Sequence, residues 1–332
     1  MTSILCLLPS IKLFLPRNSY VRMNSGFEND FAATVGFFDG VHNGHRFLAD
    51  RLKAEAAMRN LRPRMITFRE HPRLILKDGF HPLLLTSPEQ KLSLLGLLGV
   101  DSIIELHFTS QLAQMTAEEF MAGILRDKLG VKCLLMGHDH HFGHDGITDF
   151  ETYRNIGSRV GIEVVTAEAF MWEGSPVSSS RIRRCLAAGE TESAAAMLGR
   201  IYSISGTVVH GQQNGRKMGF PTANLDSEYQ YLQVPKDGVY AAWACVRDEL
   251  FMSMVNIGYR PTINGESRIR TIEAHLLDFD CDIYGEHLKL CFVRYIRPES
   301  RFKDISSLAC QLTLDRDNVR SILSSFPPPS NV

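Results

Sequence analysis

The sequence predicts an α/β domain, with a parallel sheet and helices on both faces, followed by a small antiparallel β-barrel domain with a C-terminal helix. The chain of 332 residues exceeds the size at which one hydrophobic core usually stops growing, so two domains are expected. In the first half, short apolar runs alternate with helical stretches. In the second half, longer runs alternate apolar and polar residues between Gly, Pro and Asn turns.

The first half contains short, mostly apolar runs rich in β-branched residues, which is the pattern of parallel strands buried on both faces. A helix is expected at Glu118–Leu129, because Thr116 and Glu119 have capping-box spacing just ahead of the periodic region. The strands are expected at Ala32–Phe37, Arg64–Phe68, Ser102–His107, Val131–Met136 and Ile162–Val165.

The second half is expected to close into a barrel, since closure removes the exposed edges of antiparallel strands. A terminal helix is expected at Asp304–Leu323, followed by a frayed tail at Pro327–Val332. The domain boundary is expected near Leu198–Tyr202, after the Ala-rich helical segment Ser193–Met197. The barrel strands are expected at Tyr202–Val209, Val239–Val246, Phe251–Ile257, Ile269–Leu277 and His287–Ile296.

Composition predicts a folded globular protein of ordinary charge. Apolar residues make up 44% and charged residues 22% of the chain, which leaves no room for wholesale disorder. The net charge of −1 argues against nucleic acid as a partner. The 7 cysteines are scattered and form no C-x-x-C pair, so a reducing cytoplasm is expected rather than a disulfide scaffold.

The first residues form a leader of uncertain status. The apolar stretch Ile4–Leu15 is interrupted by Pro9 and Lys12, and no basic region precedes it. We therefore expect neither a signal peptide nor a transmembrane helix. Residues 1-23 form a leader if the protein starts at Met1, and they are a mis-annotated start if Met23 is the true first residue.

A glycine- and histidine-rich turn follows the first expected strand. Free N–H groups at a helix N-terminus attract phosphate, and glycines let a phosphate chain approach the backbone. Two imidazoles three residues apart, His42 and His45, can stabilise charge on an α-phosphate while an attacking oxygen arrives and pyrophosphate leaves. The alternative is a turn with incidental histidines. The turn reads Gly36-Phe-Phe38-Asp39-Gly40-Val-His42-Asn-Gly44-His45, with a helix expected to start at about His45 or Arg46.

A second element, Val177–Arg183, lies ahead of another helical stretch, where hydroxyls and a bidentate arginine can bind β- and γ-phosphates. The alternative is a Ser N-cap with a solvated basic helix turn. Both elements resemble the phosphate-binding signatures of the nucleotidyltransferase superfamily, which implies a Rossmann-like nucleotidyltransferase domain. The residues expected to contact ATP phosphates are Gly36, Phe38, Asp39, Gly44, Ser179, Ser180 and Arg183.

The segment Gly137–His144 follows the fourth expected strand and holds four histidines. Its spacing allows a metal site, although four histidines on a short loop rarely converge on one ion. The segment also resembles the flavin-nucleotide adenylyltransferase loop that lines the substrate pocket. Asp139 and Gly143 match that loop, whereas His140 and Gly146 depart from its usual pattern.

No P-loop occurs, so phosphoryl transfer needs another scaffold. The stretch Gly215–Asn224 resembles the riboflavin kinase signature and differs mainly at Met218. Thr222 and Asn224 supply oxygen ligands suited to Mg²⁺ that the nucleotide also holds. The alternative is a Pro-anchored loop with an Asx turn. The expected kinase phosphate loop comprises Gly215, Gly219 and Pro221.

Glu273 is expected to be the general base of the kinase. A strand-borne carboxylate can take the proton from the ribityl 5′-hydroxyl of riboflavin as that oxygen attacks the γ-phosphate. The alternative is an ordinary exposed carboxylate. Arg297 and Glu299 are expected to stabilise the barrel rather than act on substrate. Further matches to the kinase signature are Gly238–Tyr240, Asn256–Thr262, Ile272–Phe279, Tyr284–Gly285 and Arg297–Glu299.

Together, the motifs cover Ala32–Phe302 and resemble the bifunctional riboflavin kinase and FMN adenylyltransferase of bacteria. The resemblance implies that residues 199-326 phosphorylate riboflavin to FMN, and that residues 24-198 adenylylate FMN to FAD with release of pyrophosphate. Expected ligands are riboflavin, FMN, FAD and ATP with Mg²⁺, and neither nucleic acid nor membrane is an expected partner. A cytoplasmic monomer or weak homo-oligomer is expected, with residues 327-332 as a disordered tail.

Two other functions stay open. A cytidylyl- or pantetheine-type nucleotidyltransferase would share the turn with two histidines, but it would lack the Pro221–Asn224 motif. A flavin-binding regulatory protein would keep the pockets and lose catalysis in one domain. The presence of His42, His45 and Glu273 argues against that second function.

Overall fold

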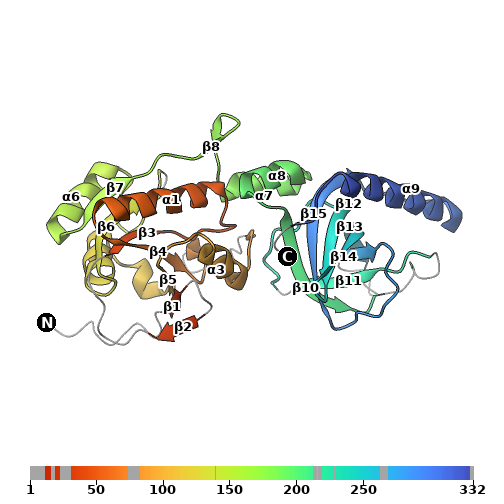
Figure 1. The fold of residues 1–332 in the computed structure, drawn as a ribbon, viewed down its shortest axis with the longest axis horizontal. Helices are drawn as coiled ribbons and strands as arrows, with labels where there is room; N and C mark the ends of the chain where they lie inside the picture. The colour runs from red at the N-terminus through yellow and green to blue at the C-terminus, as the bar shows by residue number, and fades with distance from the viewer. Residues whose placement is uncertain are drawn as a thin grey trace. The chain divides into compact units, whose positions relative to one another are not determined.

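The computed structural model describes residues 12–15, 19–22, 31–73, 83–138, 140–211, 215, 219–227, 229–261 and 268–329. Contacts divide the chain into two compact units, residues 1–179 and 180–332 (Figure 1). The functional boundary expected near Leu198–Tyr202 lies later than this division. That boundary stays a prediction, because compact packing and the limits of a functional domain are different properties.

The first unit is built on a seven-stranded sheet with the order β2-β1-β5-β4-β3-β6-β7. Strands β5, β4, β3, β6 and β7 run parallel, as the sequence predicts. From β3 the chain adds β4 and β5 along one direction of the strand order, and after β5 it returns to add β6 and β7 on the other side of β3. The switch point therefore lies between β3 and β6. In open α/β sheets, ligands bind at the carboxyl ends of the strands beside such a point. These strands are β3 (Phe31–Val35), β4 (Arg62–Phe68), β5 (Ser102–Leu106), β6 (Val131–Met136) and β7 (Glu163–Thr166).

Two further strands lie within the leader. Strand β1 (Lys12–Leu15) pairs antiparallel with β5, and β2 (Ser19–Arg22) pairs antiparallel with β1. No strand was expected in this apolar stretch, which Pro9 and Lys12 interrupt. Each run is only four residues long, so its pairing with the edge of the sheet cannot be read from its own pattern.

Helices cover both faces of the sheet, as expected. On one face, α1 (Asn43–Met58) and α3 (Pro88–Gly96) bury Leu52, Leu92 and Leu95 against the strands. On the other face, α6 (Phe150–Val160) and a π-helical segment, η2 (Phe120–Arg126), form a second core cluster. The short helices α4 (Ser110–Ala113) and α5 (Ala117–Glu119) precede η2.

The helix expected at Glu118–Leu129 differs in type from the one observed. The expected capping box between Thr116 and Glu119 is present at the start of α5. After Glu119 the chain widens into η2, where the N–H of Leu129 bonds the carbonyl of Ile124 in a turn of five residues. Gly123 lies within this segment, and glycine weakens the preference for a regular α-helix.

The second unit contains a closed six-stranded barrel with the order β10-β11-β14-β13-β12-β15. All its pairings are antiparallel, so the expected barrel class is correct. Strand β11 is the element that the sequence analysis missed. The strands are β10 (Tyr202–Val209), β11 (Ala223–Ser227), β12 (Gly238–Val246), β13 (Glu249–Pro261), β14 (Arg268–Leu276) and β15 (His287–Arg297).

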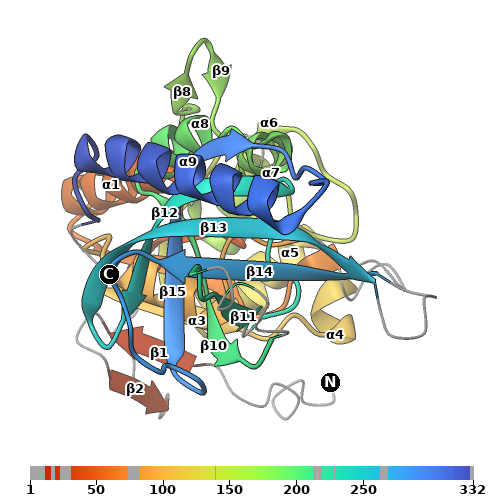
Figure 2. The same ribbon diagram turned by 90° about the vertical axis from the view of Figure 1, so that its right-hand side faces the viewer.

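Helices pack on the outside of the barrel. The C-terminal helix α9 (Ile305–Ser324) begins at the N-cap Asp304 and lies over β12 and β13, burying Val319 and Leu323 (Figure 2). Helix α8 (Thr191–Leu198) contacts β15, where the Thr191 hydroxyl donates to the Val293 carbonyl at 3.0 Å. The expected terminal helix is therefore present.

Three short elements connect the first unit's last strand to α8. Strands β8 (Met171–Trp172) and β9 (Ser175–Pro176) form a hairpin that the sequence analysis did not predict, and α7 spans Ser179–Ala188. In the part of the chain that the structure describes, no helix is both long and apolar enough to span a membrane.

Candidate active sites

The turn after β3 leads directly into helix α1. The strand ends at Val35 rather than at the expected Phe37, and the helix begins at Asn43 with His42 as its N-cap. The expectation that the helix starts at His45 or Arg46 was therefore wrong. Glycine and asparagine are poor helix formers, which conceals the first turn from a propensity argument. His45 consequently occupies the third helical position, within the first turn of α1.

The backbone of this turn has an unusual conformation. Phe38 has φ 55° and Val41 has φ 39°, in a region that costs free energy for any residue except glycine. Gly36 is required by packing, because a Cβ there would lie 2.7 Å from the Phe38 ring. Strain of this kind concentrates at functional sites, where the surrounding structure holds it.

Three hydrogen bonds hold the turn in place. The buried carboxylate of Asp39 accepts from the Leu85 N–H at 2.8 Å, and the Gly40 N–H donates to the Thr86 hydroxyl at 3.2 Å. The Ser179 hydroxyl donates to the Asp39 carbonyl at 2.9 Å. The two sequence elements expected to bind phosphate therefore meet at Asp39, although they lie 140 residues apart.

The two imidazoles form one stacked pair. The ring centroids of His42 and His45 are 3.6 Å apart, with an interplanar angle of 16°. His42 is only 4% exposed, and the Phe38 ring packs edge-on against His45. Gly44 leaves room for the pair, since a Cβ there would lie 3.1 Å from the His42 ring. The pair lies at the positive end of a helix dipole, where a developing negative charge is stabilised.

The remaining residues expected in this site lie in helix α7 and in the loop that contains Gly143. Ser180 and Arg183 lie in α7, where Arg183 Nη2 donates to the Ser180 hydroxyl at 3.1 Å. Gly143 has φ 93°, and a Cβ there would overlap Asp145 and the Ala117 backbone, so its loop is held against α5. Asp139 lies outside the described residues. Within those residues, no three His, Cys, Asp or Glu side chains are grouped to hold a metal ion.

The second site lies on the outer face of the barrel. Pairs across the strands align Asn224 with Glu273, Glu273 with Asn256, Asn256 with Val239, and Val239 with Arg297. Residues paired directly across neighbouring strands point to the same face of a sheet. Five side chains that are distant in sequence therefore form one row on the face that α9 partly covers.

This row borders a cavity of about 310 Å³ between the barrel and α9. Phe220, Phe302 and Leu312 supply apolar surface, while Glu273 and Glu299 supply two carboxylates. Arg297, which also borders the cavity, is held by the buried Asp315 of α9 at 2.6 Å. The chemistry of this cavity suits a planar apolar group that carries a polar chain.

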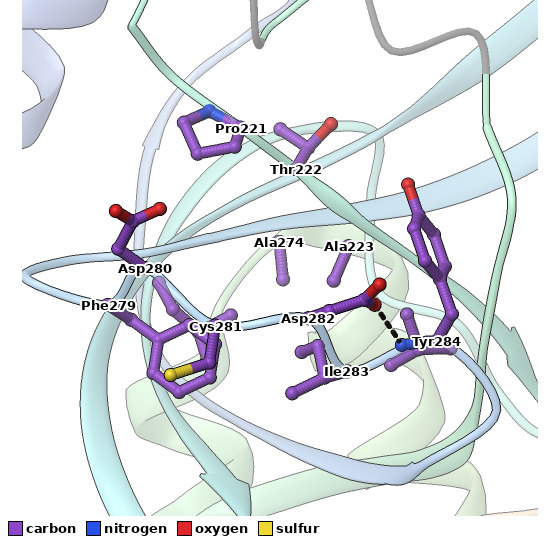
Figure 3. A pocket seen from close by; sticks show the side chains of 12 residues that line it. Pro221, Thr222, Ala223, Ala274, Phe279, Asp280, Cys281, Asp282, Ile283 and Tyr284 are labelled. Atoms are coloured by element: carbon purple, nitrogen blue, oxygen red, sulfur yellow. Dashed lines mark hydrogen bonds between the residues drawn. The ribbon is translucent and has the colours of Figure 1, made fainter.

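A second cavity of about 360 Å³ lies on the opposite face of β11 and β14 (Figure 3). Ala223 and Ala274 line it, and these residues alternate along their strands with Thr222 and Glu273, which border the first cavity. In Figure 3, Asp282 accepts from the Tyr284 N–H at 3.0 Å, and Tyr284 extends toward Thr222. Two carboxylates, Asp280 and Asp282, lie in the loop that closes this cavity.

Thr222 borders both cavities. Pairing between β11 and β14 begins at Ala223, so the chain leaves the sheet at Thr222 and the wall between the cavities ends there. The Thr222 hydroxyl donates to Glu273 Oε2 at 3.4 Å. The buried His275 donates through Nδ1 to the Pro221 carbonyl at 2.8 Å, and burial lowers the pKa of His275 below its ordinary value. The neutral imidazole thus fixes the residue before Thr222.

A backbone hydrogen bond joins two residues of the expected kinase loop. The Phe220 N–H donates to the Gly215 carbonyl at 2.9 Å, and a Cβ at Gly215 would lie 2.1 Å from the Phe220 carbonyl oxygen. Gly219 has φ 79°, in the left-handed region that favours glycine. Residues 212–214 and 216–218 of the loop lie outside the described part of the chain.

The donor set beside the loop fits a hard cation. Asn224 pairs with Glu273 across β11 and β14, and the hydroxyl of Thr222, just ahead of β11, donates to Glu273, so both lie on the face that carries Glu273. Asn224 is mostly buried, and a Cβ at Gly211 would lie 2.2 Å from its amide nitrogen, which fixes the side chain closely. Hydroxyl, amide and carboxylate oxygens are ligands that Mg²⁺ accepts, with nucleotide phosphates completing the shell.

Comparison with known proteins gives one answer for the whole chain. Residues 25–181 match the family described as FAD synthetase, and residues 198–323 match riboflavin kinase. A bifunctional riboflavin kinase/FMN adenylyltransferase from Pseudomonas fluorescens is 35% identical, over 87% of this chain and 92% of the relative. The protein of the same description from Escherichia coli K12 is 34% identical, over 89% of this chain and 93% of the relative.

The chain belongs to the bifunctional riboflavin kinase/FMN adenylyltransferase family. The resemblance and the fold class expected from the sequence are therefore confirmed. The matched families occur along the chain in the order in which the two units follow one another.

A solved structure supports the fold assigned to this chain. The crystal structure of a protein described as a macrolide-efflux protein from Streptococcus pneumoniae has a TM-score of 0.79 and 31% sequence identity. The similarity covers 89% of this chain and 95% of that protein.

Sequence reasoning missed several residues that border the kinase cavities. Arg297 and Glu299 were expected to stabilise the barrel; Arg297 does pair with Asp315 of α9, and both residues also line the outer cavity. His275 was part of a matched segment, but its bond to Pro221 could not be foreseen from spacing. Asp280 and Asp282 carried no signal beyond two acidic residues in a loop, although both line the cavity of Figure 3.

Proposed function

We propose that the barrel unit transfers the γ-phosphate of ATP to riboflavin, with Glu273 as general base. The observation that carries this proposal is that Thr222 borders two cavities, one of which contains Glu273. The outer cavity, with its aromatic and apolar surface, suits the flavin ring and directs a ribityl chain toward Glu273. The cavity beside Ala223 and Ala274 suits the nucleotide, so the two ligands would meet beside Thr222.

The kinase step follows from this arrangement. Glu273 takes the proton from the 5′-hydroxyl of riboflavin as that oxygen attacks the γ-phosphorus, and ADP leaves. Gly215, Gly219 and Pro221 form the backbone loop that cradles the phosphates. Thr222 and Asn224 would hold Mg²⁺ together with the nucleotide, and the ion would supply positive charge to the phosphate oxygens.

We further propose that the first unit joins FMN to the AMP part of ATP. An FMN phosphate oxygen attacks the α-phosphorus, and the bond to pyrophosphate breaks. The stacked imidazoles of His42 and His45 stabilise the charge on the α-phosphate from the N-terminus of α1. Contacts to the ATP phosphates are assigned to the backbone and side chains of Gly36, Phe38, Asp39, Gly44, Ser179, Ser180 and Arg183, while Asp139 and Gly143 belong to the flavin or nucleotide loop.

The proposal includes the wider setting of the enzyme. The functional limits are residues 24–198 for the adenylyltransferase and 199–326 for the kinase. A reducing cytoplasm agrees with the six cysteines in the described part of the chain, none of which is in a disulfide. We propose a monomer or weak homo-oligomer that binds riboflavin, FMN, FAD and ATP, with no nucleic acid or membrane partner.

Incubation of the full-length protein with riboflavin and Mg-ATP, followed by chromatography, tests the assignment of both activities. FMN should accumulate first and FAD should follow. FMN without FAD would contradict the role of the first unit. Bound flavin without any turnover would favour a regulatory flavin-binding protein.

A further inference from the structure

Beneath the adenylyltransferase turn lies a buried lysine that the mechanism does not use. Lys91, on helix α3, is 1% exposed. Lysine side chains are almost never fully buried without a partner, because removing an ammonium from water is costly. Methionine would fill a similar volume without that cost, so packing alone does not account for a lysine here.

Lys91 contacts the ends of two neighbouring strands. Its Nζ donates to the carbonyl of Phe68, the last residue of β4, at 2.5 Å. The same nitrogen lies 3.9 Å from the ring centroid of Phe37, which follows β3 in the turn. An ammonium at that distance is attracted to the ring face. Lys91 therefore joins the carboxyl ends of β3 and β4, next to the switch point of the sheet.

Polar contacts extend from this lysine into the turn. The Thr67 hydroxyl donates to the Phe37 carbonyl at 3.1 Å, and the Phe37 ring packs edge-on against His71 at 4.7 Å. Phe37 is thus held through its ring by Lys91 and His71 and through its backbone by Thr67. The next residues are Phe38, which has positive φ, and Asp39, which accepts from Leu85.

Charged groups face Lys91 from each element packed around it. Glu105 lies on β5, Asp39 lies in the turn, and Arg69 and Glu70 follow β4. The Glu105 side chain is 1% exposed, and within the described residues its Oε1 accepts no hydrogen bond, so its charge is balanced mainly by Arg69 and Lys91. Lys91 is the buried cation among these groups.

We propose that Lys91 is a positioning residue for adenylyl transfer, whose buried ammonium fixes the Phe37–Val41 turn and thereby the imidazole of His42. The role rests on the proposed function of the first unit. Lys91 touches neither imidazole; it acts through Phe37 and through its charge toward Asp39. No covalent step is assigned to it.

The charge of Lys91 gives the proposal a distinctive pH signature. Burial lowers the pKa of Lys91 from 10.5 to about 8; Glu105, Asp39 and Glu70 oppose this shift and Arg69 adds to it. Above that pH, the neutral amine loses its attraction to the Phe37 ring and to Asp39. FAD formation should therefore fall as the pH rises past about 8.

The titration of Lys91 does not itself destabilise the fold over the same pH range. Between about 8 and 10.5, the unfolded chain binds the Lys91 proton more tightly than the folded chain does. Stability contributed by this group therefore rises with pH in that window. Activity and stability should move in opposite directions, which separates a positioning role from a merely structural one.

The test compares wild type, Lys91→Met and Lys53→Met as full-length proteins. Lys53 is a matched control, because its Nζ also donates to a backbone carbonyl, that of Leu98, at 3.0 Å. The rate of FMN conversion to FAD and the rate of riboflavin conversion to FMN are measured with Mg-ATP in the same preparation, from about pH 7 to about pH 10. Thermal melting of each protein is followed in parallel.

The proposal expects Lys91→Met to lower kcat for FAD formation by about tenfold to a hundredfold and to abolish its fall near pH 8. FMN formation should stay at the wild-type rate, and Lys53→Met should keep the wild-type profile for both activities. A Lys91→Met protein with the wild-type rate and pH profile overturns the role.

If Lys91→Met does not melt cooperatively, the pH profile of the wild-type protein tests the role of Lys91 instead. A ratio of FAD formation to FMN formation that does not fall across pH 8 then overturns the role. A wild-type chain that makes FMN but no FAD at any pH overturns the proposed function of the first unit, and the role of Lys91 with it.

Discussion

The two units bring the residues of their candidate sites together in different ways. In the first unit, His42 and His45 are three residues apart, and the start of one helix makes them a stacked pair. In the second unit, Thr222 precedes β11, whereas Glu273 lies on β14 and Arg297 on β15, so only the barrel register places them around one cavity.

This difference determines how each site can fail. The first site depends on the conformation of a short turn, so changes that alter local geometry should matter most. The second depends on the pairing of distant strands, and its groups are held mainly by side chains from other elements. Because both activities reside in one chain, each serves as an internal control for the other.

The largest expected effect comes from replacing the proposed kinase base, Glu273, which should reduce one activity and leave the other unchanged. Glu273→Gln removes the proton acceptor, so FMN formation should fall by about a thousandfold. Conversion of added FMN to FAD should be unchanged, and chromatography of both reactions measures the split. Glu249→Gln, at an exposed glutamate at the start of β13, is the matched control. Undiminished FMN formation by Glu273→Gln would refute the base assignment.

The reverse split is expected in the first unit. His42→Ala removes one imidazole from the α-phosphate, so FAD formation should fall by about a hundredfold. FMN formation from riboflavin should persist, as measured in the same sample. An equal loss of both activities would contradict the assignment of His42 to the adenylyltransferase site.

A smaller effect tests whether Glu299 in the outer cavity contributes to riboflavin binding. A Cβ at Gly258 would lie 2.0 Å from the Glu299 carboxylate, which also accepts from the Asn256 amide at 3.0 Å. Gly258→Ala should therefore displace Glu299 and raise KM for riboflavin by about threefold to tenfold, the cost of about one hydrogen bond. Gly123→Ala is the control, since open space surrounds that position. An unchanged KM would mean that Glu299 does not contribute to flavin binding.

The smallest effect concerns pH and His275. Its lowered folded pKa means that the unfolded chain protonates first as the pH falls below the ordinary value of 6.5. Stability contributed by a neutral His275 is thus complete above that value and is lost as the pH falls further. Thermal melting of His275→Asn should lose this part of the acid dependence, because the amide can still donate to Pro221. An identical acid dependence in the variant would exclude the contribution.

Most of the fold class was predictable because hydrophobic periodicity dominates it. The five parallel strands and five of the six barrel strands are visible as apolar or alternating runs. Strand β11 was not, because Asn224, Asp226 and Ser227 have low strand propensity, and only barrel closure imposes pairing on them. Strands β1 and β2 are likewise set by an available sheet edge rather than by their own sequence.

The candidate site of the first unit was easier to predict than that of the second, because its two histidines are close in sequence and the residues of the second site are not. The turn carrying His42 and His45 was recognisable because its residues are adjacent. The helix start was wrong, since Asn43 and Gly44 hide the first turn. Glu299 and His275 could not be placed, because their contacts with Asn256 and Pro221 depend on tertiary structure alone.

The wall that ends at Thr222 has a consequence for the order of events in the kinase. Flavin and nucleotide would reach the reacting atoms from opposite faces of the same strand, so neither product has to pass the other on its way out. Either substrate can then arrive first and either product can depart first. On the proposed arrangement, we expect the substrates to bind in random order.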